Sequence, residues 1–129
     1  MSYSKIRNES FGQLCYYKDK NHKIIHREDG PAIIYPNGTK IWFQNGKHHR
    51  VDGPAVEWYD GGQIWYQYGK LHRLDGPAST TLGEDYYAIN GRDVWQREFP
   101  TAVAKYVSYI EVTTEDIKRS IGKYRIVEW

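Results

Sequence analysis

This 129-residue sequence contains one cysteine, Cys15, and one methionine. A lone cysteine cannot form a disulfide within the chain, so nothing indicates an oxidising compartment. Apolar residues never form a run near the ~20 needed to cross a membrane. The first seven residues also lack the apolar stretch of a secretory signal. We therefore expect a cytoplasmic protein that makes no membrane contact.

An excess of charge of one sign is also missing. The chain has 18 Lys and Arg against 16 Asp and Glu, which gives a net charge of +2, and the basic residues are scattered. Dedicated nucleic-acid-binding proteins concentrate basic residues, so we do not expect nucleic acid as a partner. Aromatic residues are plentiful, with 12 Tyr, 5 Trp and 3 Phe. Such residues favour half-buried β-strands.

The strongest feature is a motif, His-Arg-x-Asp-Gly-Pro-Ala, that occurs three times at a constant step of 23 residues. The copies begin at His26, His49 and His72. A fixed period of this size indicates a repeat architecture. Repetition argues against catalysis, because an active site usually needs one unique set of side chains. We expect neither an enzyme nor a cofactor.

Each motif is followed by two aromatic-rich runs on either side of a glycine turn. Asn37-Gly38 and Asp60-Gly61 predict two-residue hairpin turns of type I′, and Leu82-Gly83-Glu84 predicts a three-residue loop. We expect a mainly β fold in which antiparallel hairpins stack into one meander.

Two-residue turns would place Ile33 opposite Trp42 and Val56 opposite Trp65. That register gathers the large aromatic side chains on one face of the sheet and smaller aliphatic ones, such as Ile41, on the other. Two interpretations remain open: both faces are buried, or the aromatic face is partly open and binds a protein. The protein-binding residues predicted by the second are Tyr35, Trp42, Trp58, Trp65 and Tyr87.

The 26–92 segment, with its Asn-Gly-Lys turns and Gly-Pro-Ala motifs, resembles a variant MORN repeat. It is similar to tandem arrays in phage, giant-virus and bacterial proteins, some of them antitoxins. The resemblance implies stacked hairpins and a phage- or virus-encoded interaction module that binds and neutralises a host defence or toxin protein in the host cytoplasm. Two alternatives stay open: a small-molecule binder, such as a nucleotide sponge, and a virion or assembly component.

The motif residues support structural and functional hypotheses. The aspartates are expected to accept backbone hydrogen bonds and the glycines to adopt a glycine-only conformation. The arginines could bind an anion, or each could pair with the aspartate of its own motif. Successive histidines lie two strand spacings apart, roughly 9–10 Å, too far to share a zinc ion, so we expect no metal. The residues concerned are Asp29, Asp52, Asp75, Gly30, Gly53, Gly76, Arg27, Arg50 and Arg73.

The flanks depart from the period. Residues 1–25 are predicted to form a degenerate repeat that caps the array, with a strand at 13–17. Residues 93–129 are predicted to form an α+β cap. Its expected elements are a helix at 94–99 stopped by Pro100, a resumed helix at 101–106, a strand at 107–112, a helix ending at Gly122 and a strand at 124–129.

Overall fold

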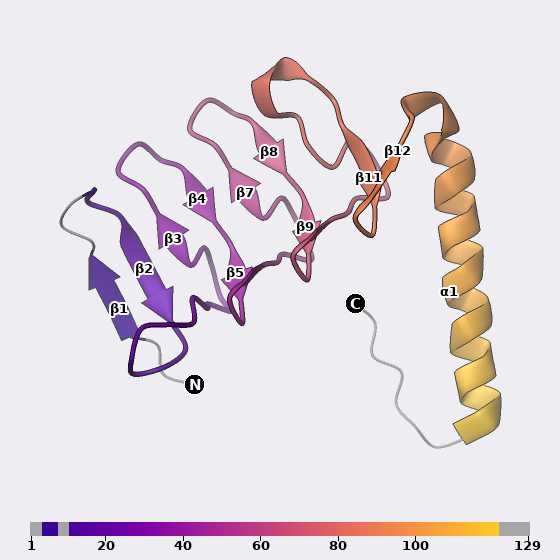
Figure 1. The fold of residues 1–129 in the computed structure, drawn as a ribbon, viewed down its shortest axis with the longest axis horizontal. Coiled ribbons are helices and arrows are strands. Elements are labelled where there is room, and N and C mark those ends of the chain that lie inside the picture. Colours follow the sequence, from indigo (N-terminus) through magenta and orange to yellow (C-terminus); the bar gives the residue numbers. More distant parts are fainter. Residues whose placement is uncertain (1–3, 8–10, 122–129) are drawn as a thin grey trace. The chain divides into compact units, whose positions relative to one another are not determined.

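The structure is a computed structural model that describes residues 4–7 and 11–121 (Figure 1). The chain forms two compact units, Met1–Asp93 and Val94–Trp129. The first consists of antiparallel strands and hairpins, and the second contains one long helix. The predicted mainly β class is confirmed.

The first unit is built on a six-stranded antiparallel sheet. Its strands, in spatial order, are β1 (Ser4–Arg7), β2 (Leu14–Tyr17), β3 (Ile33–Ile34), β4 (Lys40–Ile41), β7 (Val56–Glu57) and β8 (Gln63–Ile64). Single bridges from Ile64 to Ser79 and from Ser79 to Tyr86 continue the pairing into the third repeat. The predicted N-terminal strand is therefore present as β2, and β1 pairs with it on its outer side.

Each repeat also forms a second, two-stranded hairpin. These hairpins are β5 (Phe43–Gln44) with β6 (Lys47–His48), β9 (Tyr66–Gln67) with β10 (Lys70–Leu71), and β11 (Tyr87–Ile89) with β12 (Arg92–Val94). The loops of the array consequently form two rows on opposite sides (Figure 1). We call the row at 36–38, 59–61 and 82–84 the tip edge, and the row at 45–46, 68–69 and 90–91 the turn edge.

The predicted hairpin register is wrong by one residue. Ile33 pairs with Ile41 rather than with Trp42, and Val56 pairs with Ile64 rather than with Trp65. The loop holds three residues, because the Gly38 N–H donates to the Tyr35 carbonyl at 3.0 Å and Gly38 has φ +96°. This is a type I turn followed by a glycine bulge.

A side-chain hydrogen bond explains the choice of loop. Asn37 Oδ1 accepts the Thr39 N–H at 2.9 Å, and Asp60 Oδ1 accepts the Gly62 N–H at 3.0 Å. Such local bonds compete with the two-residue turn. The third loop is longer than the predicted 82–84, because Ser79 and Tyr86 exchange both backbone hydrogen bonds and leave 80–85 as the loop between them. Within this loop, Leu82 and Gly83 both have positive φ.

The corrected register places the aliphatic side chains together. Across the sheet, one face carries a row in register, formed by Cys15, Ile33, Ile41, Val56 and Ile64. Three of these, Cys15, Ile33 and Val56, are buried. The motif alanines are fully buried too, which leaves no room for larger side chains where the motif joins the sheet; they are Ala32, Ala55 and Ala78.

The C-terminal elements differ from the prediction. The predicted helix at 94–99 is wrong: Val94 ends β12, a 3₁₀ turn η2 covers Gln96–Glu98, and the helix begins only at Phe99. This helix, α1 (Phe99–Ile121), runs without interruption through Pro100 and through 107–112, so the predicted stop and strand are also wrong. Pro100 is tolerated because the N–H groups of a first helical turn have no helical partner. The predicted strand at 124–129 lies outside the described residues. No described helix is long and apolar enough to cross a membrane.

Candidate binding site on the repeat array

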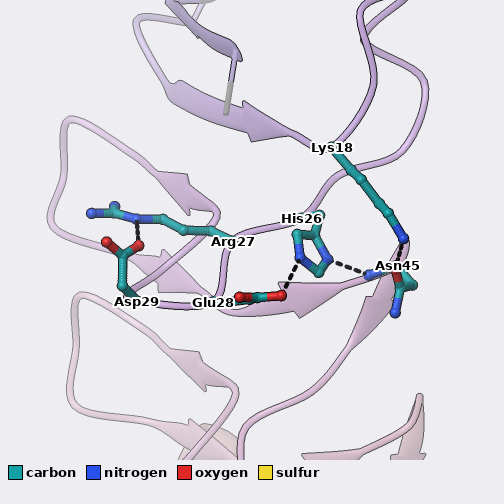
Figure 2. A network of polar contacts seen from close by, with 6 residues as sticks. All are labelled: Lys18, His26, Arg27, Glu28, Asp29 and Asn45. Atoms are coloured by element: carbon teal, nitrogen blue, oxygen red, sulfur yellow. Dashed lines mark hydrogen bonds and ion pairs between the residues drawn. The ribbon is translucent and has the colours of Figure 1, made fainter. Parts of the chain in front are cut away.

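The motif histidines are buried and accept hydrogen bonds from the backbone. The side chains of His26, His49 and His72 are buried, and each Nδ1 accepts a backbone N–H at 2.9–3.0 Å. The donors are the first residues of the turn-edge turns, which have φ +51°: Asn45, Tyr68 and Asn90. Figure 2 shows His26 bonded in this way to Asn45, with Glu28 at 3.4 Å from its other nitrogen. The histidines therefore fix the turn edge.

These contacts define the protonation state of the rings. An Nδ1 that accepts an N–H is unprotonated, so the imidazole is neutral. Burial lowers the pKa of His49 and of His72, which favours the same state. Among the described residues, no three His, Cys, Asp or Glu side chains are grouped so that they could hold a metal ion. Absence of a bound metal stays a prediction.

The motif arginines are held in stacks. The Arg50 guanidinium lies 3.9 Å from the centroid of the Trp42 ring, and its Nε donates to Asp52 at 3.1 Å. Its Nη1 donates to the Pro54 carbonyl and to Glu57, both at 3.1 Å. Such a contact combines cation–π attraction with charged hydrogen bonds.

The other two repeats reproduce the stack. Arg27 lies 4.0 Å from the Tyr16 ring and Arg73 lies 4.1 Å from the Trp65 ring, and their Nε groups donate to Asp29 and Asp75 at 2.9 and 2.8 Å. Beside Arg27, the pKa of Asp29 is lowered. Local pairing, one of the two readings of these arginines, is confirmed. Anion binding by the arginines stays a prediction. In each motif an aspartate already compensates the charge of the arginine.

The motif glycines lie close to the same guanidinium groups. A Cβ atom on Gly30, Gly53 or Gly76 would lie 3.0, 2.7 or 2.9 Å from the Cζ of the arginine in the same motif. None of the three has a positive φ. The expectation of a glycine-only conformation is therefore corrected: the guanidinium needs the space.

The five predicted protein-binding aromatic residues do not form one open surface. Trp42 and Trp65 lie under their arginines and are only partly exposed, as are Tyr35 and Tyr87. Trp58 is the most exposed of the five, at 37%. It directly precedes the second loop of the tip edge.

The tip edge carries exposed apolar residues that sequence reasoning missed. Tyr59 is 69% and Leu82 is 88% exposed, and Phe11 is 74% exposed. The period contained the signal, because Pro36, Tyr59 and Leu82 are separated by the 23-residue step. We call the set the tip patch: Phe11, Pro36, Trp58, Tyr59 and Leu82.

Contacts between neighbouring loops hold the tip edge together. The hydroxyl of Thr39, which is buried, accepts the Tyr59 N–H at 3.1 Å and joins the first loop to the second. A Cβ on Gly62 would lie 3.1 Å from Trp58 and 3.6 Å from the Thr81 backbone, so the second loop lies against the third. A Cβ on Gly12 would lie 3.0 Å from Pro36. The tip loops are therefore braced against one another.

The histidines, arginines and aspartates of the motif thus bond mostly within the array. The tip edge and the turn edge remain as its two exposed edges. Cys15, the lone thiol, is 7% exposed within β2. Comparison with protein-family models, with curated proteins and with solved structures finds no match to this chain, so no relative assigns a role to either edge.

Proposed function

We propose that this chain is a non-enzymatic module that binds a protein partner through the tip patch. The observation that carries the proposal is the exposure of large apolar side chains at successive loops, above all Tyr59 and Leu82. Clustered exposed apolar residues mark interaction sites in soluble proteins. Tyr and Trp are also the residue types that dominate binding energy at interfaces.

The backbone of the tip edge favours binding by a rigid surface. Thr39 and the close approaches at Gly12 and Gly62 hold the loops in place before any partner arrives. A pre-organised surface loses little conformational entropy on association, which leaves more of the contact energy for affinity. Trp58 lies outside the arginine stacks, so its ring can contact a partner without dismantling the interior.

Charge suggests the chemistry of the partner. Asp60, Glu84 and Asp85 are exposed in or beside the tip loops. A partner with an apolar centre and a basic rim would complement such an edge. The resemblance of the motif to antitoxin arrays supports a toxin or host defence protein, which binding at this edge would neutralise, and a phage or virus as the source.

Photo-crosslinking and affinity measurement together test the proposal. A benzophenone side chain at Tyr59 should crosslink the partner in host extract, whereas one at Tyr68 on the turn edge should not. With the identified partner purified, Trp58→Ser and Tyr59→Ser should each weaken binding at least tenfold, as truncated interface anchors do. Trp65→Ala is unsuitable because it would empty an arginine stack. If both tip variants fold and bind like the wild type, the tip patch is not the interface.

A further inference from the structure

The turn edge gathers basic side chains that are scattered in the sequence. Lys47, Lys70 and Arg92 each follow a turn and occupy equivalent positions, and all three are exposed. The Lys18 ammonium donates to Asn45 Oδ1 at 2.7 Å, which brings the 18–24 segment to the same edge (Figure 2). We call the exposed basic set the basic ridge: Lys18, Lys20, Lys23, Lys47, Lys70 and Arg92.

Packing sets the spacing of the ridge. A Cβ on Gly69 would lie 3.6 Å from the Lys47 side chain, and one on Gly91 would lie 3.6 Å from the Lys70 side chain. Each lysine stem therefore crosses the glycine of the next turn. Successive repeats are displaced by two strand spacings, so the cations recur roughly every 9–10 Å.

The three equivalent cations of the ridge differ from the motif arginines in their pairing. Whereas every motif arginine pairs with an aspartate, Lys47, Lys70 and Arg92 form no ion pair with a described residue. Three carboxylates lie beside these cations in the sequence or the fold. Asp19 accepts the backbone N–H groups of Lys23 and Ile24, Glu28 contacts His26, and Asp93 accepts the Tyr86 hydroxyl. They keep their charge, and the six cations of the ridge outnumber them.

One aromatic residue stands in the middle of the ridge. Tyr68 occupies the left-handed position, with φ +51°, that Asn45 and Asn90 occupy in the other repeats. Asparagine tolerates this conformation, whereas a bulky side chain there is an outlier. Its ring lies 4.3 Å from the His49 ring and remains 52% exposed. The left-handed site thus holds an exposed ring in the same turn as Gly69, which the Lys47 side chain crosses.

We propose that the turn edge binds single-stranded nucleic acid, with the ridge cations contacting phosphates and Tyr68 stacking on a base. Proteins that bind single strands combine cations along the backbone with aromatic rings on which bases stack. In a duplex the bases are already stacked, which would leave the ring without a partner. An acidic protein segment would use the cations but has no base for the ring. The site is separate from the tip patch.

Salt-dependent binding gives the first test. Fluorescence anisotropy with a fluorescein-labelled 15-nucleotide oligothymidylate should show binding that weakens as KCl is raised from 50 to 200 mM. For three or four phosphate contacts, log K should fall against log salt with a slope of about −2 to −3. The triple variant K47Q/K70Q/R92Q should bind at least tenfold more weakly and lose about two units of slope.

Tyr68→Asn gives the second test. It introduces the residue that the other two repeats have at the same position. It should weaken oligothymidylate binding about five- to hundredfold, because the base loses the ring on which it stacks. The slope of log K against log salt should not change, because every cation of the ridge is still present. The substitution should not lower the melting temperature, since Asn tolerates the left-handed conformation. Tyr68→Phe should keep the affinity. Tyr59→Ser, on the tip edge, is the matched control and should bind oligothymidylate like the wild type.

Several outcomes would overturn the proposal. It is wrong if the wild type does not bind the oligomer at 50 mM KCl, or if a duplex of equal length binds as tightly. Equal affinity of wild type and Tyr68→Asn would refute stacking. Displacement of the oligomer by polyglutamate at matched charge and concentration would instead identify the turn edge as a site for an acidic protein segment.

Discussion

Replacing Gly53 by Ala tests whether the motif glycine exists to make room for an arginine. The added Cβ would lie 2.7 Å from Arg50 Cζ, closer than real Cβ atoms come to a neighbour. Because Gly53 has no positive φ, alanine can adopt its backbone conformation. The strain of Gly53→Ala should therefore come entirely from the guanidinium, and should disappear when the guanidinium is removed.

The expected magnitudes follow from the contacts. Gly53→Ala should cost no more than moving the Arg50 guanidinium aside, because the added Cβ meets the far end of this flexible side chain. Arg50→Ala removes a cation–π contact worth about 0.5–2 kcal/mol and a hydrogen bond to the Pro54 carbonyl worth about 1 kcal/mol. In the Arg50→Ala background, Gly53→Ala should be neutral or slightly stabilising, because alanine restricts the unfolded chain. The coupling free energy between the two changes should be about 1–3 kcal/mol.

Urea unfolding followed by circular dichroism measures all four proteins of this cycle. Gly61→Ala is the matched control: Gly61 has φ +93° and open space around its Cβ position, so its cost should be the same with and without Arg50. If Gly53→Ala costs equally in both backgrounds, the glycine serves a backbone conformation and the stacking argument fails.

Two further predictions concern the histidines. Burial lowers the pKa values of His49 and His72 from the ordinary value of 6.5, so below that pH the unfolded chain binds more protons than the folded one. The stability that these neutral histidines contribute should be fully present above pH 6.5 and be lost as the pH falls through their pKa values in the folded state. Urea unfolding at pH 7.5 and at pH 5.5 measures the two free energies of unfolding. His49→Gln should make the difference between them smaller. An equal or larger free energy at pH 5.5 would contradict this. Elemental analysis of the purified protein should find no stoichiometric zinc, and a chelator should leave the melting temperature unchanged; one bound metal per chain would refute the interior role given to these rings.

The period made the fold predictable, whereas local turn chemistry was harder to read. Three copies of one motif indicated stacked hairpins, and the array has that architecture. Asn37-Gly38 also fits a two-residue turn, and the deciding hydrogen bond from Thr39 N–H to the Asn37 side chain has no separate signal in the sequence. A shift of one residue then exchanged Trp42 for Ile41 opposite Ile33.

The candidate sites were less predictable because they depend on which side chains the fold brings together. Pairing of Arg50 with Asp52 could be inferred from their shared motif. Stacking of Arg50 on Trp42, eight positions earlier in the chain, could not. The basic ridge was invisible for the same reason: Lys47 and Lys70 are 23 residues apart in the sequence and neighbours only in the stack.

The bond between each motif histidine and its turn also fixes where this array can change length. That bond spans 19 residues in the first two repeats and 18 in the third, and in all three it is intact. The missing residue was lost from the tip loop, where the chain between Ser79 and Tyr86 rearranged around Leu82. In this chain the one difference in repeat length thus lies at the tip edge, and the turn edge keeps the same geometry in all three repeats. A repeat can therefore change the length and side chains of its tip loop while the bond between its histidine and its turn stays in place.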